Sequence, residues 1–455
     1  MPANEEPRPW EELEKLVGES DAQRVEAFLD TLPDGEAALA VSRLSGDDQT
    51  TLLTTIDPVQ AADLIDQVPD AQAAQIIERL GPEAAAAIVD ELPSDEQADL
   101  LGDLDRFDAE AILERMAPEE ARDARELVQY ADDVAGGLMV KEFLAYAHDA
   151  TVADVLADMQ ANAETYHDYD VQYAYVTAEQ YKLVGVLRLR DLLLAQRSER
   201  IRSMMITTPQ TVSDGSPLDD LRATFDRYPF YGLPVVNAAG TLVGVVRRAD
   251  VREALADRSD NDYLKSQGII GGEELRTMPL FVRSRRRLAW LSINIVLNIV
   301  AASVIAIYQE TLAAVIALAV FLPIISDMSG CSGNQAVAVT MRELTLGLVR
   351  PTELVRVWLK EVSVGVVNGV VLGFLIAAAA WIWKGNPFLG LVVGGAMAAN
   401  TLLAVSIGGT VPLVLRRLNM DPALASGPIL TTITDMCGFF LVLSFAAALL
   451  PLLTT

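Results

Sequence analysis

Cysteine and histidine are scarce in this chain of 455 residues, which contains two of each. Cys331 and Cys437 both lie in apolar stretches, so the sequence offers no disulfide framework. His148 and His167 are isolated, and no phosphate-binding loop, catalytic triad or metal-hydrolase motif accompanies them. We therefore expect no enzyme, and the absence of a Cys/His cluster disfavours a site for soft metals.

Basic residues are also outnumbered, with 35 Lys and Arg against 63 Asp and Glu, a formal net charge of −28. The imbalance is concentrated in residues 1–130, which hold 33 acidic and 9 basic side chains. Such a surface repels nucleic acid and attracts cations or a basic partner. We therefore expect no nucleic-acid partner.

Long apolar runs are absent from the first 280 residues and dominate the remainder. Leu288 to Ile307 is long enough to cross a bilayer, at about 20 residues. Four more apolar stretches follow, at about 312–341, 361–383, 389–415 and 423–450, so we predict five spans. We expect Pro323, Gly330 and Gly333 to break the long second span.

The basic residues around these stretches predict the orientation of the chain. Ten of them lie in flanks and loops that would share one side: Arg283, Arg285, Arg286, Arg287, Arg342, Arg350, Arg356, Lys360, Arg416 and Arg417. Only Lys384 falls on the other side. The positive-inside rule therefore places the N-terminal region in the cytosol and the C-terminus outside a multi-pass protein of the cell membrane.

The acidic N-terminal region contains a repeat of 12 residues. Apolar residues recur at this interval, each followed by Pro, Asp or Ser: Leu32, Leu44, Ile56, Val68, Leu80, Leu92, Leu104 and Met116. A unit of this length fits a helix of about two turns and a connecting turn, and such helices must stack to bury an apolar core. We predict an all-α superhelix. Asp95 and Asp99 share one helix face and could hold a cation together.

A second pattern occurs twice in the middle region. Leu183-Val-Gly-Val precedes Asp191, and Leu242-Val-Gly-Val precedes Asp250. Two copies of a helix, a strand, and a strand with this glycine resemble the tandem CBS pair, an α/β regulatory module. That resemblance implies a cleft for ATP or another adenine nucleotide. The candidate nucleotide contacts are Asp191, Arg188, Phe230 and Arg247. The two arginines replace the usual Ser or Thr and could pair with phosphate. Phe230 could instead be a core aromatic.

Two carboxylates fall inside predicted spans, Asp327 and Asp435. Inserting such a side chain into the membrane costs about 2.5–3.5 kcal/mol, so we take both residues as candidates for a functional role. Thr431 and Gly427 precede Asp435 at helical spacing, beside Pro428, and together offer the oxygen-rich lining that a hard cation prefers. The alternative is a carboxylate that is protonated or paired within the bundle. In the second span, Gly330 allows close helix approach and Gln335 supplies an amide oxygen.

The chain resembles the MgtE family of magnesium channels and transporters in two respects. One is the order of these regions, and the other is the run Asp-Pro-Ala-x-x-Ser-x-Pro-x-x-Thr-x-x-x-Asp that ends at Asp435. The resemblance implies a homodimer in which Asp435 faces the pore and recognises hydrated Mg²⁺. The family's second-span motif is kept at Gly330, Gly333 and Gln335, but Cys331 replaces its Asn. The resemblance also implies a gating helix, closed by Mg²⁺ held between acidic residues. The candidates are Asp95, Asp99, Asp250, Glu253 and Asp262.

The expected fold is therefore multi-domain. It comprises an extension (1–30), the acidic helical-repeat domain (31–135), two CBS units (136–200 and 201–250), a linking helix and connector (251–283) and a five-span α-helical membrane domain (284–455). The expected function is import of Mg²⁺ gated from the cytosol, with lipid and divalent cations as partners. A carrier for Mn²⁺ or Co²⁺, and a membrane-anchored ligand sensor without transport, are the alternatives.

Overall fold

The computed structural model describes residues 8–19, 21–167, 169, 172–271, 274–276 and 278–454, without the side chains of residues 34, 424 and 425. The first seven residues of the predicted extension lie outside these ranges. The chain forms two compact units. The first comprises the residues up to Arg258 together with Leu275–Met278, and the second comprises Ser259–Glu274 and the residues from Pro279 onwards.

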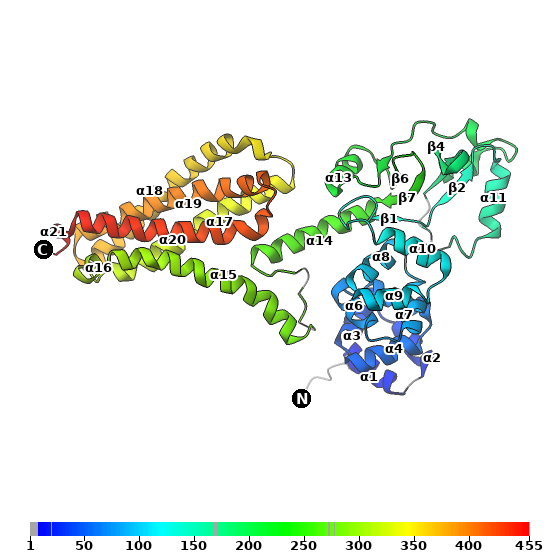
Figure 1. Ribbon diagram of the computed structural model, residues 1–455, viewed down its shortest axis with the longest axis horizontal. Helices are drawn as coiled ribbons and strands as arrows, with labels where there is room; N and C mark the ends of the chain where they lie inside the picture. The colour runs from blue at the N-terminus through cyan, green and yellow to red at the C-terminus, as the bar shows by residue number, and fades with distance from the viewer. Residues whose placement is uncertain are drawn as a thin grey trace, which may run out of the picture. The chain divides into compact units, whose positions relative to one another are not determined.

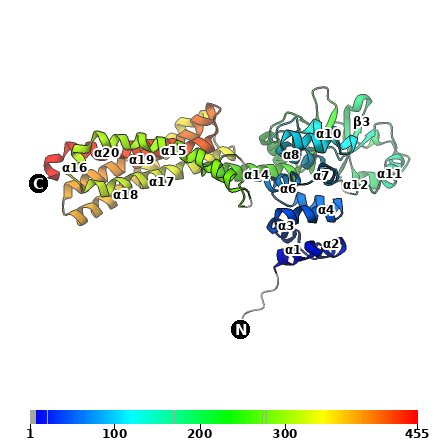
Figure 2. The ribbon, with the colours of Figure 1, turned by 60° about the horizontal axis from the view of Figure 1, so that its bottom comes forward.

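Ten short helices build the first part of the first unit (Figures 1 and 2). They are α1 (Pro9–Glu19), α2 (Ala22–Leu29), α3 (Asp34–Arg43), α4 (Gly46–Thr55), α5 (Pro58–Asp66), α6 (Asp70–Ile77), α7 (Pro82–Val89), α8 (Ser94–Asp103), α9 (Arg106–Leu113) and α10 (Pro118–Leu127). Many pack on the next helix but one, as α5 does on α7 and α7 on α9. One continuous apolar core from Leu13 to Ala124 results.

The helix starts follow from local chemistry. Asp57 and Asp105 accept hydrogen bonds from backbone N–H groups in the first turns of α5 and α9. Pro58, Pro82 and Pro118 occupy first-turn positions, where the missing N–H costs nothing. The 12-residue periodicity thus corresponds to one helix and one turn for each repeat.

Two small sheets follow in the same unit. One has the order β2-β3-β4, from β2 (Leu144–Ala147), β3 (Tyr173–Thr177) and β4 (Leu183–Arg188), with α11 (Val152–Ala161) and α12 (Leu189–Leu194). The other has the order β1-β7-β6-β5, from β1 (Met139–Val140), β7 (Leu242–Arg247), β6 (Gly232–Val236) and β5 (Val212–Ser213), with α13 (Leu218–Arg227). The strand β1 falls within the predicted first CBS unit (136–200) but pairs with β7 and so completes the second sheet.

The helix α14 (Arg248–Ser266) follows β7 directly, beginning in the first unit and ending in the second. The second unit then continues with α15 (Leu280–Ile307), α16 (Gln309–Ala314), α17 (Leu318–Thr345), α18 (Leu354–Lys384), α19 (Pro387–Arg417), α20 (Pro422–Ala448) and α21 (Leu450–Leu453). The central helix is α19, which packs on α17, α18 and α20.

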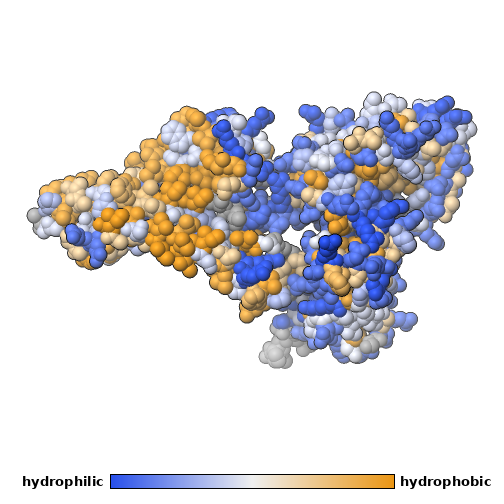
Figure 3. Space-filling model, viewed as in Figure 1, coloured by the Kyte–Doolittle hydropathy of each residue, from blue (hydrophilic) through white to orange (hydrophobic). Residues whose placement is uncertain are grey.

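Four helices in the described part of the chain are long and apolar enough to cross a membrane: Leu280–Ile307, Pro351–Lys384, Pro387–Arg417 and Ser426–Ala448. Apolar side chains of α15 and α18 are widely exposed, and this surface gives the second unit its hydrophobic appearance in Figure 3. The predicted second span corresponds to α16 and α17. Although α17 has 28 residues, its polar side chains set it apart from the four apolar helices.

The predicted break of the second span was wrong in position. The helix α17 runs continuously through Pro323, Gly330 and Gly333, and the interruption lies at residues 315–317, between α16 and α17. Pro323 is only the sixth residue of α17, close to the end where backbone N–H groups lack partners in any case. Gly333 lies against Gly408 of α19, since a Cβ atom at Gly408 would lie 2.2 Å from the Gly333 carbonyl oxygen.

Candidate functional site

Asp435 lies in the middle of α20, on its packed side. Asp421 caps the helix by accepting a hydrogen bond from the Ala423 N–H at 2.9 Å, and the helix passes through Pro428. One turn after this proline, the Thr432 hydroxyl donates to the Pro428 carbonyl at 2.7 Å. Asp435 retains 9% exposure, and its carboxylate accepts a hydrogen bond from the Ser326 hydroxyl of α17.

The other predicted pore residues fall into two sets. Thr431 is exposed one turn before Asp435, and Gly427 is half-buried a further turn back. On α17, Asp327 and Gln335 are exposed whereas Gly330 is buried. The same face of α17 also exposes Cys331 and Asn334; together with Asp327 and Gln335 these residues form a polar stripe at spacing i, i+4, i+7 and i+8. The opposite face of α17 is buried in the bundle.

In the first unit, one guanidinium lies between two of the predicted regulatory acids. Arg247, the last residue of β7, forms an ion pair with Asp95 of α8 through Nη2 at 2.9 Å. Its Nε lies 2.8 Å from an oxygen of Asp250, in the first turn of α14. The side chains of Asp95 and Asp250 are only 7% and 11% exposed. A positive charge supplied by the chain therefore occupies the space between two buried carboxylates.

Asp95 is also held through its neighbour Ser94, the first residue of α8. The Ser94 hydroxyl donates to Glu142 at 2.7 Å and accepts from the Lys141 N–H at 2.8 Å. Burial raises the pKa of Asp95 to about 6, with Arg247 opposing the rise and Asp250 and Glu142 adding to it. The start of α8 is thus joined to the second CBS sheet by charged and neutral hydrogen bonds.

A second group of acids repel one another beside this pair. Burial raises the pKa of Glu96 to about 9, and Asp95 and Asp66 add to the shift. The pKa of Asp99 rises to about 7, through burial and then the charges of Asp132 and Asp95. No three His, Cys, Asp or Glu side chains meet in a metal-binding arrangement within the described ranges. The acids thus form a surface of high negative potential rather than a finished coordination shell.

Family models match three parts of the chain: the MgtE intracellular N domain at residues 32–133, the CBS domain at 133–198 and 201–257, and a divalent cation transporter at 322–445. The magnesium transporter MgtE of Thermus thermophilus is 33% identical over 335 residues, 72% of each chain. That of Bacillus subtilis is 30% identical over 330 residues, again 72% of each. The chain belongs to the MgtE family.

A solved structure, the soluble part of a magnesium transporter, resembles this chain with a TM-score of 0.50 and 24% identity, covering 55% of this chain and 98% of the other. It supports the fold of the N domain and CBS pair. Because the family is one of divalent cation transporters, the expectation that the chain is not an enzyme is confirmed. With its four apolar helices, this member of the family is a multi-pass membrane protein.

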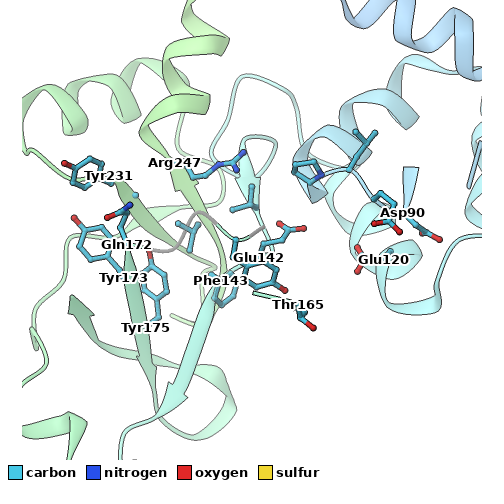
Figure 4. Close-up of a pocket in the computed structure, with 17 residues that line it drawn as sticks. Asp90, Glu120, Glu142, Phe143, Thr165, Gln172, Tyr173, Tyr175, Tyr231 and Arg247 are labelled. Atoms are coloured by element: carbon cyan, nitrogen blue, oxygen red, sulfur yellow. The ribbon is translucent and has the colours of Figure 1, made fainter. Parts of the chain in front are cut away.

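A cavity of about 320 Å³ is lined by residues of the N domain and of the CBS pair (Figure 4). Aromatic side chains line one part, among them Tyr173, Tyr175 and Tyr231, and carboxylates including Glu120 and Glu142 line another. Of the four predicted nucleotide contacts, only Arg247 lines this cavity, and its guanidinium is already paired.

The other three nucleotide candidates lie elsewhere. Phe230 stacks on Tyr228, with ring centroids 5.3 Å apart. Arg188 is exposed at the end of β4, and Asp191 lies 3.6 Å from Arg190. The structure therefore does not bring the four candidates together in one cavity.

The remaining regulatory candidates lie on α14. Burial raises the pKa of Glu253, with Asp257 and Asp250 contributing. Asp262 is half-buried and belongs to the second unit. Near the end of the helix, Lys265 forms a 3.2 Å ion pair with Asp421, the residue that caps α20.

Sequence reasoning missed two residues next to Asp435, Ser326 and Asn400. Asn400 of α19 is fully buried and donates from Nδ2 to the Thr434 carbonyl at 3.1 Å. An asparagine inside the apolar run 389–415 was a usable signal, because buried polar residues in membrane helices are rare and functional. The partner of Ser326 lies 109 positions away, so nothing local indicated it.

Proposed function

We propose that this protein conducts Mg²⁺ into the cell along a path that Asp435 lines. The observation that supports it best is a carboxylate held inside an apolar bundle, with the exposed polar stripe of α17 on a neighbouring helix. A membrane helix cannot turn an exposed Asp, Asn and Gln toward lipid without cost. The stripe is therefore expected to face water, as in a pore, or a second copy of the chain.

A pore between two copies of the chain accounts for both the Asp435 carboxylate and the polar stripe of α17. We propose a homodimer with five spans per chain, in which α17 is the span that lines the pore and the C-terminus lies outside. Mg²⁺ dehydrates reluctantly and keeps several waters. Asp435 would hold such a hydrated ion through charge and water-mediated hydrogen bonds, with Thr431, Gly427, Asp327, Gly330 and Gln335 shaping the path.

Gating is proposed to depend on the acids of the N domain and of α14. In the family pattern Mg²⁺ joins such acids, whereas here Arg247 already pairs with Asp95 and Asp250. Response to cytosolic Mg²⁺ should therefore arise mainly from Asp99, Glu253 and Asp262 and should be shallow. A nucleotide such as ATP remains a proposed ligand of the CBS pair.

Transport of Mn²⁺ or Co²⁺ is the second candidate, and the exposed Cys331 on the polar stripe favours it. A thiol ligand prefers ions that are softer than Mg²⁺. Flux measured in proteoliposomes with Mg²⁺, Mn²⁺, Co²⁺ and Ca²⁺ separates the two. Saturable Mg²⁺ flux that exceeds that of the other ions supports the proposal, and flux of Mn²⁺ or Co²⁺ without Mg²⁺ rejects it.

A further inference from the structure

Asn400 lies on α19, the central helix of the second unit. It has no exposed surface, and Val393, Ala396 and Met397, which lie one to two turns earlier on the same helix, are buried as well. Its Nδ2 donates to the Thr434 carbonyl of α20 at 3.1 Å. The orientation of the amide follows from chemistry, since only the NH₂ group can face a carbonyl oxygen.

The other half of the same amide is unsatisfied. Asn400 Oδ1 has no hydrogen-bond partner within the part of the chain that the structure describes. A buried acceptor without a donor costs at least as much free energy as a neutral hydrogen bond contributes, so the unpaired Oδ1 offsets the bond that Nδ2 makes. Packing alone would therefore favour leucine at this position, so the asparagine calls for a functional explanation.

The hydrogen bond from Asn400 to Thr434 lies next to Asp435 on the chain. The Thr434 carbonyl belongs to the peptide group that immediately precedes Asp435, so the hydrogen bond restrains the backbone from which that carboxylate projects. One turn later, Gly438 leaves the room that Asn400 needs: a Cβ atom there would lie 2.8 Å from Asn400 Nδ2. Asn400 thus contacts α20 on both sides of Asp435.

A second helix restrains the carboxylate itself. Ser326 of α17 donates its hydroxyl to Asp435 Oδ1. The backbone of Asp435 is therefore held from α19 and its side chain from α17. A carboxylate restrained in this way keeps its distance from a hydrated ion, and that distance decides whether water-mediated contacts fit one ion better than another.

We infer that Asn400 is a positioning residue for the ion site, which fixes Asp435 through the Thr434 carbonyl and thereby sets affinity and ion preference. This inference rests on the proposed role of Asp435. Asn400 acts on the ion only through Asp435. Stability and transport should therefore respond to its replacement in different directions.

The test is Asn400→Leu in the full-length protein, in proteoliposomes, with thermal unfolding measured alongside. We expect the unfolding temperature to stay the same or rise. Half-saturating Mg²⁺ should increase about tenfold, with maximal flux less affected, and preference for Mg²⁺ over Co²⁺ should fall. Wild-type half-saturation and preference would overturn the inference, and so would a large loss of stability with lost flux, because that outcome marks a structural role.

Thr340→Val is the matched control. Thr340 of α17 is also buried and donates to a backbone carbonyl across helices, that of Gly409, at 3.1 Å. Gly409 lies nine residues from Asn400, about 13 Å along α19. The control should keep wild-type half-saturation. Asp435→Asn, assayed in parallel, separates the two levels: retained flux there rejects the pore assignment, whereas lost flux with a wild-type Asn400→Leu rejects the positioning role alone.

Discussion

Replacing Arg247 by Gln removes the guanidinium that lies between Asp95 and Asp250. Both carboxylates would remain almost buried and would lose the guanidinium with which they pair. Breaking a buried ion pair by removing one partner costs about 3–5 kcal/mol. Because Arg247 itself is 26% exposed, water relieves part of this, and we expect a loss of about 2–3 kcal/mol at pH 8.

The loss of stability in Arg247→Gln should be larger at high pH than at low pH. The pKa of Asp95 is raised to about 6 in the folded protein, against an ordinary value of 3.8. A raised carboxyl pKa means that its stabilising contribution is complete in acid and is lost as pH rises through about 6. Without Arg247 the unpaired charge appears only above that range, so the destabilisation should be smaller at pH 5 than at pH 8.

Magnesium should partly replace the missing cation. Two vacated carboxylates would bind a divalent ion, and a tenfold excess over Kd stabilises the folded state by about 1.4 kcal/mol. Pulse proteolysis of the full-length protein in urea, with and without Mg²⁺, measures both effects on the cytosolic region. We expect a Mg²⁺-dependent gain in Arg247→Gln that exceeds the gain in the wild type.

Arg115→Gln is the control, because it breaks the 2.7 Å pair with Glu83, in which both side chains are exposed. Such pairs contribute less than about 1 kcal/mol, and no Mg²⁺ response should follow. If Arg247→Gln matches the wild type at pH 8 and gains no Mg²⁺ dependence, the guanidinium does not hold the two acids together and this account of gating fails.

Three further outcomes are expected. Glu96→Gln should stabilise the cytosolic region by about 1–3 kcal/mol at pH 8 and leave its stability unchanged at pH 4. The reason is that the pKa of Glu96 is raised to about 9 in the folded protein, so this carboxyl lowers the free energy of unfolding as pH rises. Urea unfolding at the two pH values checks this. In Lys265→Glu, two carboxylates would lie where Lys265 and Asp421 now form their 3.2 Å ion pair. The concentration of internal Mg²⁺ that half-inhibits flux should therefore fall, and an unchanged concentration contradicts a role for this contact. Deleting residues 1–270 should leave Mg²⁺ flux that no longer responds to internal Mg²⁺, and lost flux in a folded, dimeric truncation argues against this division of labour.

Local signals predicted much of this molecule. The N-terminal helices begin at prolines and at capping residues such as Asp57 and Asp105, whose preference for helix starts is a property of the first turn alone. Leu-Val-Gly-Val predicted β4 and β7 because a short run of apolar and β-branched residues is a local signal for a strand. In β7, Gly244 lies where a Cβ atom would contact the Met139 side chain, a neighbour that sequence alone could not name.

Contacts between distant residues could not be predicted. Asp95 and Arg247 are 152 positions apart, and each was assigned separately, one to a cation and one to a phosphate. Their meeting depends on how α8 packs against the second CBS sheet, which periodicity does not encode. The same holds for Ser326 and Asn400, whose roles appear only when α17, α19 and α20 are packed together.

The most direct test of the account is Mg²⁺ flux through Asp435→Asn in proteoliposomes. The substitution keeps shape and hydrogen-bonding capacity but removes one negative charge per chain, two in a dimeric pore. A loss of even about 3 kcal/mol in ion binding reduces occupancy more than a hundredfold. We predict that flux is abolished or nearly so in a protein that still folds and dimerises, and that Asp435→Glu is intermediate. Wild-type flux through a well-folded Asp435→Asn protein would contradict the central claim.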